Sequence, residues 1–173
     1  MLFSPQIPLQ LVPHRESRFA DFVNGPNSAV VDALKHMPDE AGSHVFLYGD
    51  TGSGKTHLLN ALCYEMRERQ GRACYLALKR LPKDAIASLQ GLEKLDLVCV
   101  DDLHIIAGQQ TWEEALFHCF NRIREAGGRL LVSSRLRLSA LNLGLPDLAS
   151  RLAWGLRLPL MPLEDDDKLA VVN

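Results

Sequence analysis

The feature that most constrains the fold is the stretch at residues 45–56, which reads VFLYGDTGSGKT. An apolar, strand-like run ends at Gly49, and the spacing G-x-x-x-x-G-K-T then ends in Gly54, Lys55 and Thr56, where a helical pattern begins. Glycines let a backbone wrap around a phosphate and point successive N–H groups toward it, and the helix N-terminus favours the negative charge. The stretch therefore predicts a phosphate-binding loop. Lys55 is expected to reach the β- and γ-phosphates of a nucleotide, and the Thr56 hydroxyl is expected to ligate Mg²⁺.

Strand-like and helical patterns alternate along most of the chain. Strands are predicted at residues 45–48, 73–78, 97–101, 129–133 and 156–160, and helices at 29–37, 55–70, 82–90, 111–126 and 146–154. Strands that alternate with helices are typical of a parallel sheet with helices on both faces. We therefore expect an α/β fold with a five-stranded parallel sheet.

A second chemical landmark follows the third predicted strand, which reads LVCVDD at residues 97–102. Ligands of open parallel sheets collect at the carboxyl ends of the strands. Asp101 is predicted to hold Mg²⁺ there, and Asp102 to orient a water for attack on the γ-phosphate. An apolar run before two aspartates is a weak motif alone, because it also marks a strand that enters a polar turn. With a phosphate-binding loop about fifty residues upstream, it indicates a P-loop nucleotide-binding domain.

The overall charge argues against a protein that binds DNA non-specifically. The chain of 173 residues has 19 basic and 21 acidic residues and a net charge of -2. Non-specific DNA binding relies on many contacts from Lys and Arg to phosphates, so little direct DNA binding is expected. No basic groove frames Trp112 or Trp154, which are expected to pack in the core or in an interface rather than to stack on bases.

The four cysteines, at positions 63, 74, 99 and 119, form no C-x-x-C pair. They are expected to be buried free thiols, and a zinc site is not expected. The N-terminus has no signal-peptide pattern, and no stretch has the length of a membrane span. A cytoplasmic protein with no membrane contact is therefore expected.

Four segments resemble the nucleotide-binding core of DnaA-type AAA+ proteins. They are residues 22–27, 47–59, 100–103 and 141–152. Within the family, the last segment, LNLGLPDLASRL, is most similar to the Hda branch, the regulatory inactivators of DnaA. The resemblance covers residues 3–173. It implies a P-loop NTPase fold, with an AAA+ core at residues 19–163.

The resemblance also implies roles for individual residues. Phe22 and Val23 match the family's linker beside the adenine, and the implied cofactor is ADP or ATP with Mg²⁺. The residues that match the phosphate cradle are Asp50, Thr51, Gly52, Ser53, Gly54, Lys55, Thr56 and His57. Arg151 matches the family's arginine finger, which acts in trans on a nucleotide bound by a neighbouring subunit. Without the resemblance, Arg151 would be interpreted as a solvated helix residue or as part of a local salt bridge.

The N-terminal residues 1–18 are predicted to form an extended tail, because they hold three prolines and no helical periodicity. The hexapeptide QIPLQL at residues 6–11 resembles the peptide with which the Hda branch docks on the sliding clamp, the β subunit of DNA polymerase III. Gln6, Leu9 and Leu11 are the expected contact residues, because spaced aliphatic side chains of an extended peptide can fill the pockets of an apolar groove. Gln10 stands where the family's motif has a proline.

Two further departures from the family pattern concern the nucleotide site. Residues 164–173 are expected to begin the first helix of the family's helical lid, and two alternatives stay open for the rest of the lid: it is truncated, or the protein naturally lacks it. The first sensor stretch, residues 133–135, reads SSR, whereas the family usually has an acidic residue there. An arginine near the γ-phosphate could bind it, but it could not orient a water as a carboxylate does. Weak intrinsic ATPase activity is therefore expected.

Three functions are compatible with these observations. The first is a regulator that docks on the sliding clamp and promotes hydrolysis of ATP bound to DnaA. Its catalytic residues would be Asp102 and Arg151, the latter acting in trans. It would also be able to form homo-oligomers. The second is a DnaA-like initiator or a helicase-loader ATPase. The third is an isolated nucleotide-binding module that works as an ordinary ATPase. The first is preferred because of the 141–152 segment, the tail and Arg151.

Overall fold

The structure is a computed structural model that describes residues 16–164, and its centre is a five-stranded parallel sheet. The strands are β1 (His44–Tyr48), β2 (Ala73–Ala77), β3 (Leu97–Asp101), β4 (Arg129–Ser134) and β5 (Leu156–Pro159). Their order across the sheet is β2-β3-β4-β1-β5, and every neighbouring pair is parallel. The predicted α/β class and the five-stranded parallel sheet are therefore confirmed.

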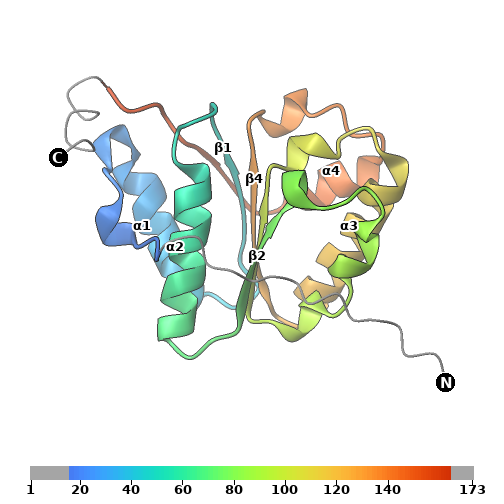
Figure 1. The fold of residues 1–173 in the computed structure, drawn as a ribbon, viewed down its shortest axis with the longest axis horizontal. Helices are drawn as coiled ribbons and strands as arrows, with labels where there is room; N and C mark the ends of the chain where they lie inside the picture. Colours follow the sequence, from blue (N-terminus) through green and yellow to red (C-terminus); the bar gives the residue numbers. More distant parts are fainter. Residues whose placement is uncertain (1–15, 165–173) are drawn as a thin grey trace.

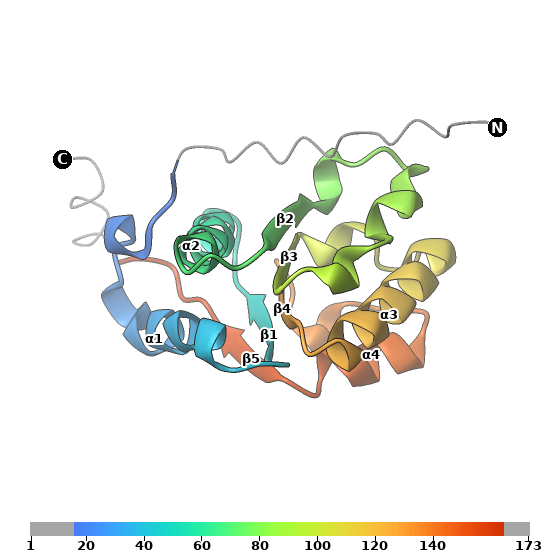
Figure 2. The same cartoon turned by 90° about the horizontal axis from the view of Figure 1, so that it is seen from below.

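Four α-helices cover the two faces of this sheet (Figure 1). They are α1 (Ser28–His36), α2 (Lys55–Glu68), α3 (Gln110–Glu125) and α4 (Pro146–Leu152). Helices α1 and α2 lie on one face and α3 and α4 on the other, which Figure 2 shows from the end of the sheet. Each face has its own apolar core, because strand side chains alternate between the two faces. No helix within residues 16–164 is long and apolar enough to cross a membrane.

Short 3-10 helices join the main elements. Within the described residues they are η1 (Phe19–Asp21), η2 (Gly25–Asn27), η3 (Met37–Asp39), η4 (Leu78–Arg80), η5 (Ala85–Leu89), η6 (Leu92–Lys94), η7 (Leu103–Ile105) and η8 (Leu138–Ala140). The helix predicted at residues 82–90 is therefore wrong, because only the 3-10 turn η5 forms there. Its buried residue is Leu89, so the segment lacks the repeated apolar contacts that stabilise a longer helix.

The strand register brings the carboxyl ends of the three central strands together. Tyr48, the last residue of β1, lies opposite Ser134 of β4, and Asp101 ends β3 one residue beyond the pair formed by Val100 and Val132. The phosphate-binding loop predicted after β1 and the acidic pair predicted after β3 are thus at the same edge of the sheet. This edge is where ligands of open parallel sheets bind.

The side chain of Asn27 ties the entry of α1 to the chain that leaves β5. Its amide donates to the Met161 carbonyl at 2.9 Å and accepts from the Met161 N–H at 2.8 Å, and Asn27 is almost fully buried. Gly49 contributes to the same region, since a Cβ at this position would lie 2.4 Å from the Leu160 carbonyl oxygen. The chain after β5 therefore packs directly against the start of the phosphate-binding loop.

Some sequence predictions lie outside the described residues. These are the clamp-binding contacts of Gln6, Leu9 and Leu11, and nearly all of the lid segment at 164–173. The four cysteines lie within the described part of the chain, and all are free and buried, as predicted.

Candidate functional site

The predicted phosphate-binding loop wraps around the ammonium group of its own lysine. Lys55 Nζ donates to the carbonyl oxygens of Gly49 at 2.6 Å and Asp50 at 2.7 Å, and it lies 3.3 Å from Ser53 Oγ. Burial lowers the pKa of Lys55, and the nearby carboxylates of Asp101 and Asp102 oppose this effect. A buried cation that is held by loop carbonyls can exchange them for the oxygens of a phosphate.

Gly54, which precedes the first residue of α2, takes a backbone conformation that side chains rarely adopt, with φ of 99°. A Cβ at this position would lie 2.6 Å from the ring of Phe22. The Phe22 ring also lies 5.8 Å from that of His57, and His57 Nε2 is 2.9 Å from the Arg18 carbonyl oxygen. The segment before α1, which includes the predicted adenine-binding residues Phe22 and Val23, thus packs on the phosphate-binding loop through the Phe22 ring.

The carboxylate of Asp101 is fully buried and accepts hydrogen bonds from three hydroxyl groups. Thr56 Oγ1 and Tyr75 Oη each donate to Asp101 Oδ2 at 2.6 Å, and Ser133 Oγ donates to Oδ1. Burial, and then the bond to Asp101, raise the pKa of Tyr75, so the phenol stays protonated and keeps donating. These three donors come from α2, β2 and β4, and together they fix the orientation of the carboxylate.

The chemistry of this donor set fits the implied Mg²⁺. Hydroxyl and carboxylate oxygens are ligands that Mg²⁺ prefers, and it commonly binds one or two protein groups together with substrate phosphates. The Thr56 hydroxyl and the Asp101 carboxylate are already in contact, at the N-terminus of α2. They are therefore the residues of the described chain that would hold the ion beside a bound nucleotide.

Asp102, the predicted water-orienting residue, is held from two sides. Its backbone is left-handed, with φ of 63°, and its N–H donates to Ser133 Oγ at 3.0 Å. Its carboxylate lies 3.4 Å from Lys79 Nζ, and 16% of its side chain is exposed. The ion pair with Lys79 occupies an oxygen that could otherwise hold a water.

The residues of the sensor stretch at the end of β4 differ in burial: the two serines are buried, and the arginine is exposed. Ser133 and Ser134 are fully buried, and Ser133 supports both Asp101 and Asp102. The Arg135 side chain is exposed, while its backbone N–H donates to His104 Nδ1 at 3.1 Å. Burial lowers the pKa of His104, an effect that Asp102 opposes. The positive charge of Arg135 is near enough to Lys55 to add slightly to the lowering of its pKa, whereas a contact of Arg135 with the γ-phosphate stays a prediction.

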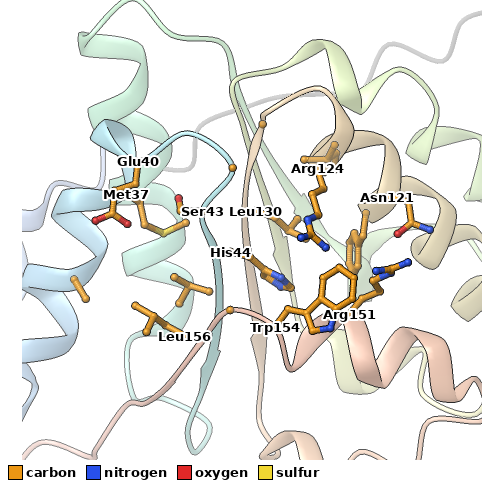
Figure 3. A pocket seen from close by; sticks show the side chains of 17 residues that line it. Met37, Glu40, Ser43, His44, Asn121, Arg124, Leu130, Arg151, Trp154 and Leu156 are labelled. Atoms are coloured by element: carbon orange, nitrogen blue, oxygen red, sulfur yellow. The ribbon is translucent and has the colours of Figure 1, made fainter.

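Arg151 lies at the opposite end of the sheet from the phosphate-binding loop. It occupies the last turn of α4 and lines a cavity together with His44, Leu130 and Leu156, which lie at the starts of β1, β4 and β5 (Figure 3). Its guanidinium carbon lies 3.9 Å from the centre of the Trp154 ring. Trp154 is 52% exposed, which corrects the expectation of core packing but leaves an interface role open.

The comparison with protein families decides which family this geometry belongs to. Residues 14–159 match the model of the bacterial DnaA ATPase domain. The chain belongs to that family.

Three solved structures have a similar fold. Domain III of DnaA from Thermotoga maritima is 26% identical, with a TM-score of 0.81 over 91% of this chain and 72% of that one. AMPPCP-bound DnaA from Aquifex aeolicus is 24% identical, with a TM-score of 0.75 over 87% and 51%. A DNA replication initiation factor is 23% identical, with a TM-score of 0.80 over 91% and 53%. The chain spans about half the length of the last two, and their identity to it supports the fold alone.

A buried glutamate connects α3 to the start of the arginine-bearing helix α4 in this DnaA-family chain. Glu113 is fully buried, and its carboxylate accepts three backbone hydrogen bonds: from Gly108 at 2.6 Å, Gly144 at 3.1 Å and Leu145 at 2.7 Å. Leu145 immediately precedes α4, which begins at Pro146. Glu113 therefore fixes where α4 starts and, through that helix, where Arg151 lies.

Sequence reasoning missed several residues of the site. They are Lys79, Glu113, Tyr75 and Ser133 as a support for Asp101. One signal was available for two of them. Tyr75 and Ser133 stand near the carboxyl ends of apolar strands, where a polar side chain faces the ligand edge. Glu113 gave no such signal, because a glutamate in the first turn of a helix is usually a solvated, dipole-stabilising residue.

The imidazole of His44 makes stability depend on pH. Burial, and then the nearby Arg124, lower the pKa of His44 to about 4 from 6.5. The unfolded chain therefore binds the proton first, so the free energy of unfolding should fall as pH drops from 6.5 to about 4 and should be retained above 6.5. The slope should not exceed about 1.4 kcal/mol per pH unit. Urea denaturation between pH 4 and 7 measures it.

The matched variants for this measurement are two single substitutions of histidine by glutamine. His44→Gln should flatten the slope, because it removes the titrating group. His36→Gln should leave the slope unchanged, because His36 is exposed on α1. Equal slopes in wild type and His44→Gln would contradict the prediction.

Proposed function

We propose that this chain is a DnaA-family regulator of the Hda type. It binds ADP or ATP with Mg²⁺, docks on the sliding clamp through Gln6, Leu9 and Leu11, and presents Arg151 to ATP held by DnaA. The result is faster hydrolysis of DnaA-bound ATP and inhibition of re-initiation. In this proposal the chain is a nucleotide-binding protein with weak intrinsic ATPase activity that works in the cytoplasm.

The observation that carries the proposal is the distance of Arg151 from the chain's own phosphate-binding loop. The two lie at opposite ends of β1, whose five residues span about 16 Å. Arg151 therefore cannot reach a nucleotide held by Lys55 of the same chain. No carboxylate within residues 16–164 forms an ion pair with it. An arginine so placed is suited to a phosphate that another molecule carries.

The phosphate end of the chain supports nucleotide holding with little turnover. Bound Mg²⁺ would neutralise charge on the phosphates. Lys55 would exchange the Gly49 and Asp50 carbonyls for phosphate oxygens, while Thr56 and Asp101 would hold the ion. Lys79 engages the Asp102 carboxylate, which favours weak hydrolysis in this chain. The AMPPCP bound to the Aquifex aeolicus relative supports a nucleotide as the ligand of this family.

Nucleotide binding should depend strongly on the lysine of the loop. Lys55→Ala is expected to raise the Kd for ADP or ATP by about 10- to 100-fold, because it removes the charge-assisted hydrogen bonds to the phosphates. Isothermal titration in the presence of Mg²⁺ measures the change. Lys94→Ala is the control, since Lys94 is exposed and precedes β3 at the other end of the sheet. Equal Kd values for the two variants would contradict the assignment.

The regulatory activity can be tested by mixing the protein with ATP-loaded DnaA and with clamp loaded on DNA. The wild-type chain is expected to accelerate hydrolysis of the DnaA-bound ATP. Gln6→Ala should weaken this effect and binding to the clamp. Gln10→Ala should weaken both less, because Gln10 is not one of the expected contact residues. An unchanged rate of hydrolysis on addition of the wild-type chain would overturn the proposal.

A second candidate function is a DnaA-like initiator or helicase-loader ATPase, which membership of the DnaA family favours. The near-neutral charge of the chain counts against tight DNA binding. Titration with duplex and single-stranded DNA at low salt distinguishes the two. Tight binding to either, with no effect on DnaA-bound ATP, would favour this second function.

A further inference from the structure

A cavity of about 420 Å³ lies at the N-terminal ends of the strands, away from the phosphate-binding loop (Figure 3). The starts of β1, β4 and β5 line it, and it extends between the helix layers on the two faces of the sheet. Arg124, Arg151 and Trp154 lie together on one side, and Glu40 lies on the other. A cavity of this volume can hold a small polar group of a ligand.

Two buried polar atoms on the cavity wall have no hydrogen-bond partner. They are Ser43 Oγ and His44 Nε2, and within residues 16–164 they are the buried side-chain polar atoms that lack one. Buried polar groups are normally satisfied by protein, water or a ligand. Both residues line the cavity, so a polar ligand bound there would lie next to side chains whose hydrogen-bonding capacity is unused.

The cavity has two arginines on one side that form no ion pair with a carboxylate of the described residues. The guanidinium carbons of Arg124 and Arg151 lie 4.0 and 3.9 Å from the centre of the Trp154 ring. The two carbons are therefore no farther apart than the sum of these distances. Neither arginine forms an ion pair with a carboxylate within residues 16–164, Glu40 of the opposite wall included. Two guanidinium groups within this distance repel each other, and an anion that contacts both offsets the repulsion.

The pairing with Trp154 suits phosphate recognition in particular. A guanidinium group that stacks on an aromatic ring keeps its N–H edge free, and this edge matches two oxygens of a phosphate. The stacking also reduces the conformational freedom of both arginines before a ligand binds. Two such groups at this spacing can contact neighbouring phosphates of one polyphosphate.

We infer that this cavity binds a diphosphate through the guanidinium groups of Arg124 and Arg151 together, and that Trp154 positions both arginines. Ser43 and His44 supply the polar wall. The inference deepens the proposed function and rests on it for one source of the ligand, the terminal phosphates of a nucleotide held by a partner. The other source is a free inorganic diphosphate.

The binding test uses pyrophosphate and the wild-type chain, with the two tryptophan indole N–H signals followed by ¹⁵N NMR. Trp154→Phe identifies the signal of Trp154, and the buried Trp112 serves as the internal reference. Pyrophosphate is expected to shift the Trp154 signal in a saturable way. Arg124→Gln should raise the Kd from this signal at least tenfold, whereas Arg72→Gln, at the other edge of the sheet, should leave it unchanged. No shift, or equal Kd values in all three proteins, overturns the inference.

Pyrophosphate that binds the phosphate-binding loop does not confuse this result, because that loop lies at the far end of β1 and its binding does not depend on Arg124. The positioning role of Trp154 has its own readout. Trp154→Ala should weaken activation of DnaA-bound ATP hydrolysis, and Trp154→Phe should restore most of it, with Kd for ADP unchanged in both. A loss that phenylalanine does not restore overturns the positioning role.

The source of the phosphates follows from the hydrolysis assay with DnaA. If Arg124→Gln lowers activation and weakens pyrophosphate binding, the ligand is the nucleotide of the partner. If Arg124→Gln activates normally but no longer binds pyrophosphate, the diphosphate site is supported and its ligand is a free diphosphate. If the wild-type chain activates nothing, the proposed function fails, and the NMR titration still decides whether the diphosphate site exists.

Discussion

Under the proposed function, replacing Arg151 with alanine is expected to lower the activation of DnaA-bound ATP hydrolysis by roughly 10³-fold, or to the rate of DnaA alone. The physical reason is that a guanidinium group neutralises the charge that develops on the transferring phosphoryl group. The measurement is single-turnover hydrolysis of labelled ATP preloaded on DnaA, with clamp on DNA. Binding of ADP to the variant should be unchanged, because Arg151 lies a strand length away from Lys55.

Two matched variants separate the role of Arg151 from general effects of charge. Arg72→Ala removes the same charge at the other edge of the sheet, where the side chain is 66% exposed, and should activate like wild type. Arg151→Lys keeps the charge but loses the planar fork, so its activation should stay close to that of the alanine variant. Full activation by Arg151→Ala would show that the group that acts on DnaA-bound ATP lies elsewhere.

Removal of the Glu113 carboxylate should have the largest effect on stability. Glu113→Ala leaves three buried N–H groups, those of Gly108, Gly144 and Leu145, without their acceptor. Each costs about 1 kcal/mol or more, so the free energy of unfolding should fall by about 3 kcal/mol. For a chain of this length, this corresponds to a fall in Tm of roughly 6–12 °C, measurable by circular dichroism.

Glu114 is the natural control for this prediction, because it is adjacent in α3 and exposed, and its side chain accepts only from the Gln110 amide. Glu114→Ala should change Tm by little. Glu113→Gln keeps the shape and one acceptor, and it should lie between the two. It should also weaken activation of DnaA at temperatures where the variant is folded, because α4 and Arg151 are less firmly placed. Equal Tm values for Glu113→Ala and Glu114→Ala would contradict the assigned role.

The parts of this molecule that could be predicted from sequence are those encoded by neighbouring residues. The loop from Gly49 to Thr56 and the acidic pair after β3 are local patterns, and each fixes its own strand, turn or helix. The parallel order then brings them to one edge without further information. The strand predictions were accurate to within one residue at each end. Strands β1 to β4 are largely buried on both faces, and such continuous apolar runs have clear boundaries.

The remaining features depend on contacts between residues that are distant in sequence. The 82–90 segment has a helical composition, but Leu89 is the one buried residue of η5, so a tight turn suffices. The partners of Glu113 and the stacking of Arg124 on Trp154 join separate elements, and no spacing rule links them. Sequence alone therefore located the phosphate-binding edge but not the contacts of Glu113 and Trp154 that position Arg151.

The separation of Lys55 and Arg151 by the length of β1 has a consequence for assembly symmetry. A contact that sets the Arg151 end of one molecule against the phosphate end of another joins two different surfaces, so it is heterologous. Such a contact does not form a two-fold symmetric dimer in which each nucleotide site receives Arg151 from the other molecule. Each molecule can therefore present its arginine to one neighbour only. An open linear assembly of these domains would be polar: the nucleotide at one end would have no arginine from a neighbour, and the arginine at the other end would contact no nucleotide.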